Sequence, residues 1–221
     1  MEWIKLAIIV TMGAIGLHST GMELESRDQI TVSGPVEVRL HHSAMPLIKF
    51  DPSTVAVSRN GNQITVSADQ PAHIVIETNL LQSLRIADGV LLVKLEGSER
   101  VQISQTSAPE VRVCLSDRAR LDADVLDAAH LRVMLAGQGK VSLKNLTADL
   151  FVLNIRDESD IDVTGQTRYQ DVALSDHSHY NGKELVSEDA KIALEGFAAG
   201  FIQATNLPTV KRAPFASLSF L

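Results

Sequence analysis

Apolar and polar residues alternate along the second half of the chain in blocks that repeat every 20 residues. Blocks with the same apolar alternation begin at Val111, Leu131 and Phe151, a fourth begins one residue early at Gln170, and a fifth begins at Lys191 in a looser register. Alternation with a period of two predicts β-strands. A repeat of this length predicts that each block is one coil of a stack, because a single coil cannot bury its apolar face alone.

Aligning the blocks gives columns of equivalent positions, and most of the columns that we expect to face inward are apolar. These columns are Val113, Val133, Leu153, Val172 and Ile192; Leu115, Leu135, Ile155, Leu174 and Leu194; Leu121, Val141, Ile161 and Tyr180; and Ala123, Leu143, Val163 and Gly182. One turn position holds only small residues, which predicts a tight corner: Ala119, Gly139, Ser159, Ser178 and Ala198. A third inward side is indicated by Leu126, Leu146 and Leu185, and we expect Gln166 to interrupt it. The sequence therefore predicts an all-β fold, a parallel β-helix (β-solenoid) with coils of about 20 residues.

The first half of the chain, about residues 28–105, is rich in predicted strands but less regular. Apolar or alternating segments occur at 30–40, 55–66, 74–76 and 90–95, and Asn60-Gly61 and Asp88-Gly89 are turn signals. We expect this half either to continue the stack or to form a sheet on its end. Because the end of a solenoid exposes unpaired backbone groups, caps are expected at 22–28 and in the tail from Asn206, which contains Pro208 and Pro214.

The first 21 residues have the pattern of a secretory signal peptide. Lys5 precedes 12 nearly uninterrupted apolar residues, 6–17, which is shorter than the 18–20 or so that a spanning helix needs. We expect cleavage after Gly21; an uncleaved N-terminal anchor is the alternative. The predicted organisation is a signal peptide at 1–21, a β-helical domain at 22–205, and a C-terminal tail or cap at 206–221, with export to the periplasm, the outer surface or the medium.

Charge and aromatic content narrow the classes of partner. The chain carries 27 acidic and 20 basic side chains, and its longest basic run is the pair Lys211-Arg212, so a nucleic acid partner is disfavoured. Only 4% of residues are aromatic, and the one tryptophan, Trp3, lies in the leader, which leaves few rings for stacking. Cys114 is the only cysteine, and its alternating strand context predicts a structural thiol.

The sequence resembles a known family, the putative auto-transporter adhesin, head GIN domain. The resemblance rests on residues 30–40, on Thr78-Asn79-Leu80-Leu81 followed by Asp88-Gly89-Val90-Leu91, and on the blocks from Val111. The corner that commonly reads Ser-Gly-small-Gly in that family is approached here only by Ala136-Gly137-Gln138-Gly139. The resemblance covers about residues 28–205 and implies a β-helical fold at the cell envelope or outside it, with no catalytic residues to carry over.

The most polar predicted surface lies at the corners of the third and fourth blocks. Neighbouring coils would bring together Asp157, Glu158, Asp160, Asp176, His177 and His179. Such carboxylates and imidazoles could hold a calcium or transition-metal ion, or could serve as the paired carboxylates of a glycoside-cleaving β-helix. Their spacing matches no standard metal motif, and a solvated corner is the plain alternative.

Catalytic signatures are missing from the sequence: no Ser-His-Asp arrangement with supporting context, no Cys pair and no HExxH motif occurs. We therefore expect a non-enzymatic binding domain of adhesin type that needs no cofactor and no resident metal. Its strand faces and corners would bind a glycan or protein of the envelope or a surface, with no nucleic acid partner and no transmembrane domain after signal removal. A carbohydrate-active enzyme and a purely structural envelope protein remain the alternatives.

Overall fold

The structure of the protein is a computed structural model that describes residues 20–220. The described residues form seventeen strands and no helix, which confirms the all-β prediction. The strands are β1 (Thr20–Glu23), β2 (Gln29–Ser33), β3 (Val36–His41), β4 (Leu47–Phe50), β5 (Ala56–Asn60), β6 (Gln63–Ser67), β7 (Ala72–Glu77), β8 (Leu80–Ile86), β9 (Val90–Leu95), β10 (Arg100–Leu115), β11 (Arg120–Leu135), β12 (Lys140–Ile155), β13 (Asp160–Leu174), β14 (His179–Leu194), β15 (Ala199–Ala204), β16 (Thr209–Arg212) and β17 (Ser217–Phe220). The predicted signal peptide lies outside the described residues except for Thr20 and Gly21, which belong to β1. Among the described residues, no helix is long and apolar enough to cross a membrane.

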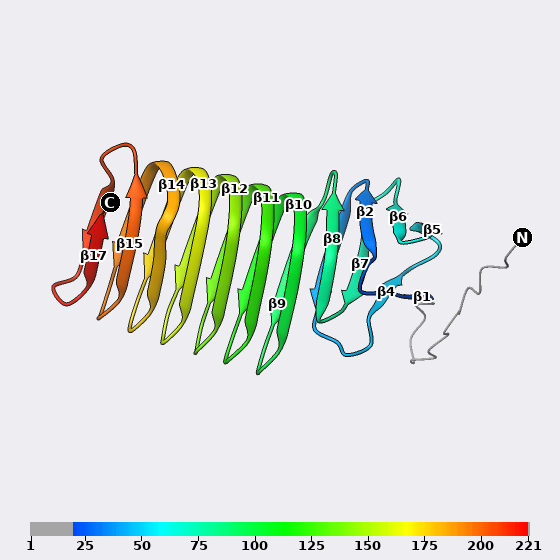
Figure 1. Ribbon diagram of the computed structural model, residues 1–221, viewed down its shortest axis with the longest axis horizontal. Coiled ribbons are helices and arrows are strands. Elements are labelled where there is room, and N and C mark those ends of the chain that lie inside the picture. Colours follow the sequence, from blue (N-terminus) through cyan, green and yellow to red (C-terminus); the bar gives the residue numbers. More distant parts are fainter. Residues whose placement is uncertain (1–19, 221) are drawn as a thin grey trace, which may run out of the picture.

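The second half of the chain is the predicted solenoid, in which each of the strands β10 to β14 is one coil stacked parallel on the next (Figure 1). The register joins Val113 to Val133, Leu153, Val172 and Ile192, as the sequence columns predicted. These five side chains are at most 1% exposed. Burying an aliphatic side chain is worth about 1.5–3 kcal/mol, so the shared interior of the coils supplies much of the stability.

Each coil has three sides, because pairs of adjacent outward residues turn the chain at two corners. In β11 side one spans 121–123, side two 126–128 and side three 131–135, and the corners are Asp124-Val125 and Ala129-His130. The inward residues alternate along these sides: Leu121 and Ala123, Leu126 and Ala128, and Leu131, Val133 and Leu135. The third inward side indicated by Leu126, Leu146 and Leu185 is therefore confirmed.

The expected interruption of that side by Gln166 is wrong. Gly165, with a φ of 126°, pairs with both Leu146 and Leu185, whereas Gln166 points outward. The coil loses one residue at the corner between Leu143 and Leu146 of its neighbour, which also explains why the fourth block starts early. Only glycine fits there, because a Cβ on Gly165 would lie 2.1 Å from the carbonyl oxygen of Leu146.

The tight corner that follows side three is also confirmed. Its small residues Ala119, Ser159, Ser178 and Ala198 are at most 1% exposed, and Gly139 is buried with them. A larger side chain at this position would have to displace the coil above or below it.

The N-terminal half continues the stack, but in an order that differs from the order along the chain. The coil made of β2 and β3 lies between the coil of β6 and β7 and the coil of β8 and β9, with parallel pairing on both sides. The far end is covered by antiparallel strands: β5 pairs with β6, β4 pairs with β7, and β1 pairs with β4. Both sequence alternatives for this half, a continued stack and an end sheet, thus occur together.

The two segments expected as caps lie at opposite ends. In the first, Asp28 is 2% exposed and both of its carboxylate oxygens accept hydrogen bonds from Arg59, at 2.7 and 2.9 Å. In the tail, β16 pairs parallel with β14 and β17 pairs parallel with β15, while Pro208 and Pro214 lie outside these strands. The tail therefore lengthens the ladder by one short coil.

Candidate functional site

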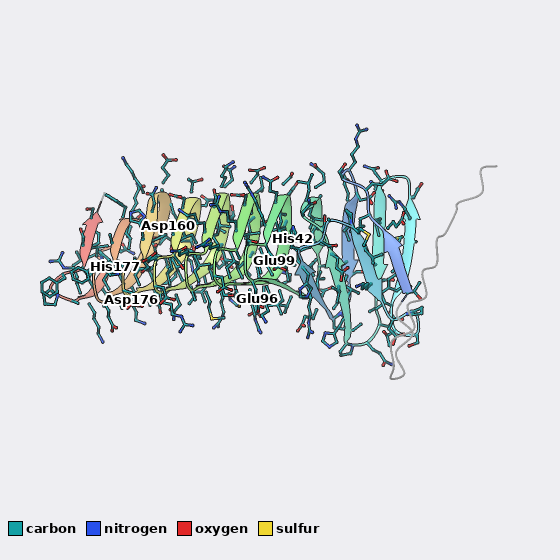
Figure 2. The ribbon with its side chains drawn as sticks, turned by 90° about the horizontal axis from the view of Figure 1, so that it is seen from below. His42, Glu96, Glu99, Asp160, Asp176 and His177 are labelled. Atoms are coloured by element: carbon teal, nitrogen blue, oxygen red, sulfur yellow. The ribbon has the colours of Figure 1, made fainter. Side chains whose placement is uncertain are left out.

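The six residues of the predicted polar corner do come together on two neighbouring coils. Asp157 and Glu158 lie in the turn before β13, Asp176 and His177 lie in the turn before β14, and Asp160 and His179 start those two strands. Asp160 pairs directly with His179, and the backbone N–H of His177 donates to the carbonyl oxygen of Asp157 at 2.9 Å. Figure 2 shows Asp160, Asp176 and His177 over the C-terminal half of the rod, with Glu96 and Glu99 nearer its middle.

The two turn aspartates form hydrogen bonds with the backbone of the preceding coil. Asp157 and Asp176 have left-handed backbone angles, with φ of 64° and 60°. The Oδ2 atom of Asp157 accepts the backbone N–H of Gly137 at 2.8 Å, and the Oδ2 atom of Asp176 accepts that of Asp157 at 3.3 Å. Aspartate tolerates this backbone conformation better than most residues because its short side chain bonds to nearby backbone groups.

The hydrogen bonds at this turn alter the titration of Asp176. The Ser175 hydroxyl donates to its Oδ2 at 2.8 Å, and this bond, with the N–H of Asp157, lowers the pKa of Asp176 below its ordinary value of 3.8. The charged carboxylate is the form that these donors favour. A general acid needs the opposite shift.

Glu158 and Asp160 are paired with side chains of the preceding coil. Gln138 donates to the Oε2 atom of Glu158 at 2.8 Å and accepts from Arg118 at 3.2 Å, which makes a chain across three coils. The Nζ atom of Lys140 lies 2.7 Å from the Oδ2 atom of Asp160. These contacts are exposed, and each contributes at most about 1 kcal/mol.

The two histidines lie against phenylalanine rings of the next coil. His177 stacks on Phe197 with ring centroids 5.3 Å apart, and Phe197 stacks on Phe215 at 5.5 Å. His179 meets Phe201 edge to face at 6.2 Å. The stack of His177, Phe197 and Phe215, here called the aromatic ridge, is exposed, with Phe197 at 59% and Phe215 at 73%.

The aromatic ridge was not predicted from the sequence, although the repeat contains its signal. Phe197 occupies the position of His177 one block later, and Phe215 lies in the corresponding turn of the last coil, between β16 and β17. Among the residues that the structure describes, there is no group of three or more His, Cys, Asp or Glu side chains that could hold a metal ion. The geometry therefore lends no support to a metal site at the corner.

Tyr180, which the sequence columns placed on the inner face, is fully buried. Its hydroxyl donates to Oε1 of Gln170 at 2.9 Å, and Nε2 of Gln170 donates to the Ser187 hydroxyl at 2.7 Å. Burial raises the pKa of the Tyr180 phenol. A Cβ on Gly182 would lie 2.3 Å from the Tyr180 hydroxyl, so glycine occupies this inward position to make room for the ring.

Cys114 lies half-buried on the outward face of side three, next to Met134 in the register. Burial is the largest influence on the thiol and raises its pKa, which Lys94 and Arg112 oppose. A raised pKa leaves less of the thiolate, which is the nucleophilic form.

A shallow groove of about 610 Å³ runs over side two of the coils β11 to β14. Its centre is a column of outward residues in register, namely Asp127, Thr147, Gln166 and Val186. The corner beside this column carries Asp149, Arg168 and Glu188. This side-two groove was not singled out by the sequence, because its polar residues look like an ordinary solvated strand face.

The outward polar side chains at the centre of the side-two groove lack hydrogen-bond and ion-pair partners in the described residues, as Arg132 and Asn154 do on side three. Elsewhere, ion pairs join neighbouring coils, as between Lys144 and Asp124 at 3.1 Å and between Lys191 and Asp171 at 2.9 Å. Within residues 20–220, six outward polar side chains of the groove have neither a hydrogen bond nor an ion pair, whereas the inward Thr167 and Ser187, which also line it, are hydrogen-bonded. These six are Asp127, Thr147, Asp149, Gln166, Arg168 and Glu188.

Comparison with solved structures gives matches along nearly the whole chain. A putative adhesin from Parabacteroides merdae is 13% identical, with 95% of this chain and 98% of that chain covered and a TM-score of 0.45. A putative adhesin from Bacteroides fragilis is 12% identical over 92% and 96% of the two chains, with a TM-score of 0.43. A putative adhesin from Parabacteroides distasonis is 12% identical over 95% and 98%, also with a TM-score of 0.43.

Family comparison gives the more specific result. No curated protein sequence matches the chain. The family model described as putative auto-transporter adhesin, head GIN domain, matches residues 51–211, which include β5 to β15 and most of β16 but not β1 to β4. The resemblance seen in the sequence is thereby confirmed, and the chain belongs to the putative auto-transporter adhesin, head GIN domain family.

Proposed function

We propose that this chain is an exported, non-catalytic binding domain that holds a glycan or protein of the envelope or of another surface against the side of its rod. Membership of a family named for adhesins supports a role in surface binding. The in-register stack suits this role, because its rigid faces keep side chains at fixed spacings and need little ordering when a partner binds.

Export is supported by the sequence of the leader. Lys5 and the apolar segment 6–17 have the order and length of a signal peptide. The family name, which refers to auto-transporter adhesins, agrees with a position at the cell surface. We propose that the mature protein begins near residue 22 and acts in the periplasm, on the outer surface or in the medium.

The observation that carries the proposed binding function is the set of unpartnered polar side chains in the side-two groove. Asp127, Thr147 and Gln166 follow one another on adjacent coils with no partner in residues 20–220. Outside this groove, the carboxylates of Asp160 and Asp171 are paired with lysines of adjacent coils. Hydrogen-bonding groups that are held in place but unused within the fold are available to a ligand.

The contacts at the corner carboxylates favour binding over catalysis. Glycoside cleavage by two carboxyl groups requires one of them to have a raised pKa. The pKa of Asp176 is lowered instead, and Asp160 is paired with Lys140. The enzyme alternative therefore has less support than the binding function.

The test is a binding experiment with envelope fractions and intact cells. Purified protein from residue 22 onward should sediment with an envelope fraction or a cell surface, and Asp127→Asn with Gln166→Ala should weaken this sedimentation. Asn154→Ala, on the exposed face of side three, is the matched control. A protein that bound no such surface, and instead turned over a polysaccharide in a manner lost on Asp160→Asn, would contradict the proposal.

A further inference from the structure

The spacing of the side-two groove is set by the coils themselves. Asp127 pairs with Thr147, Thr147 with Gln166, and Gln166 with Val186, so the column advances by one strand at each step (Figure 1). Neighbouring strands lie about 4.8 Å apart, which makes the column roughly 14 Å long from Asp127 to Val186. A ligand that used all four positions would have to be an extended chain lying along the axis of the rod.

The chemistry of the column suits hydroxyl groups. The carboxylate of Asp127 accepts hydrogen bonds, the Thr147 hydroxyl both donates and accepts, and the amide of Gln166 offers two donors and an acceptor. Adjacent hydroxyls on a sugar ring each present one donor and one acceptor, so they can satisfy these groups. Val186, which is 44% exposed, adds an apolar contact of the kind that the C–H face of a sugar can cover.

The same groove is a poor site for a protein segment. A peptide that binds by strand addition needs an open strand edge, and here β11, β12, β13 and β14 are each paired on both sides. Protein interfaces concentrate their binding energy in aromatic and aliphatic anchors, whereas no aromatic side chain lines this groove.

Charge excludes one further class of ligand. The groove carries the carboxylates of Asp127, Asp149 and Glu188 against the single guanidinium of Arg168. This excess of negative charge repels a polyanion such as an acidic polysaccharide.

We propose that the side-two groove binds a neutral, hydroxyl-rich polysaccharide chain that runs along the rod with about one sugar unit per coil. This inference rests on the proposed binding function and names its ligand class. Hydrogen bonds to one sugar unit are few and exposed, so binding gains strength from the number of coils engaged. Affinity should rise with oligosaccharide length and level off at about four units, the length that the column spans.

The experiment measures binding of oligosaccharides from glucan, mannan, xylan and galactan, from dimers to hexamers, by calorimetry and by amide chemical shifts. We expect at least one series to bind in a length-dependent manner. Gln166→Ala should weaken it about two- to twelvefold, which is the range for one neutral hydrogen bond. Thr147→Val preserves shape and strand preference and should have a similar effect. Asn154→Ala on side three should leave the affinity unchanged, and polygalacturonate should not bind.

The outcomes separate the ligand class from the proposed function. If none of the four series binds while groove-dependent sedimentation with the envelope persists and is abolished by protease, the partner is a protein and the glycan inference is overturned. If sugars bind equally well to wild type and to Gln166→Ala, the assigned position is wrong. If the wild-type protein bound neither the sugars nor the envelope fraction, the proposed function would be overturned as well.

Discussion

Asp157 and Gly137 occupy the same turn position of adjacent coils, and the carboxylate of Asp157 accepts the backbone N–H of Gly137 at 2.8 Å. Both residues have positive φ angles, 64° and 76°. The same position is filled by Gly97, Asp117, Asp176 and Gly196 in other coils, also with positive φ. At this corner, aspartate therefore supplies both a tolerated left-handed backbone and a hydrogen bond between coils.

The dual role of Asp157 predicts a graded loss of stability. Asp157→Gly keeps the left-handed backbone but removes the hydrogen bond, and should cost about 1 kcal/mol of unfolding free energy. Asp157→Ala also places a side chain without a local hydrogen bond in the left-handed region, and should cost roughly 2 kcal/mol. Urea unfolding of the three proteins checks the order; equal stability of the Ala and Gly variants would contradict the backbone argument.

The lowered pKa of Asp176 predicts that the stability of the fold depends on pH. The pKa of Asp176 is lowered in the folded state, so its charged form stabilises the fold above the unfolded-state pKa, near 3.8, and this contribution disappears as pH falls through the folded-state pKa. Asp176→Asn should therefore be less stable than wild type at pH 7, and the difference should shrink between pH 4 and pH 2. Asp149→Asn is the control, because Asp149 has no partner within residues 20–220. A difference between Asp176→Asn and wild type that stayed constant over this range would argue against the carboxylate contacts.

The buried position of Leu135 between two coils predicts that neighbouring coils unfold cooperatively. Leu135 is 2% exposed and lies between Leu115 and Ile155 of the neighbouring coils. Leu135→Asp buries an unpaired carboxylate and leaves a cavity, so it should cost at least about 3 kcal/mol and unfold several coils together. Met134→Asp, one residue away on the outward face, should change stability by less than about 1 kcal/mol. Retention of the wild-type unfolding curve by Leu135→Asp would refute its inward placement.

Much of the regular half followed from the sequence because each coil repeats one local pattern. The inward columns through Val113 and Leu135 need only strand alternation and a constant period, both of which can be counted. The one-residue deletion beside Gly165 could not be located from the sequence, because it lies at a corner and leaves the alternation on either side intact. The order of the N-terminal coils also escaped prediction, because β2 can pair with β6 and β8 only through contacts between distant segments.

The candidate site was harder to predict because side-chain type does not reveal whether a group is already used. Asp157 and Asp176 look like metal ligands in the sequence, but they accept hydrogen bonds from the backbone of the preceding coil. Thr147 and Gln166 look like ordinary surface residues, and their lack of partners emerges only when both neighbouring coils are in place. The local sequence therefore pointed to the corner residues as available for binding and gave no sign that the polar residues of side two are unpaired.

The packing of Tyr180 against Gly182 predicts a reciprocal pair of substitutions. Gly182→Ala should destabilise the fold by about 2 kcal/mol or more, since the new methyl group would overlap the Tyr180 ring in a fully packed interior. Tyr180→Leu alone leaves a cavity and removes the hydrogen bond to Gln170, so it should also destabilise.

In the double variant, the smaller leucine makes room for the methyl group, and the Leu-Ala pair approaches the Ile161 and Val163 pair that fills these positions one coil earlier. The combined cost measured by urea unfolding should therefore be smaller than the sum of the two single costs by about 1 kcal/mol. Simple additivity would mean that the ring and the glycine do not share the space between coils.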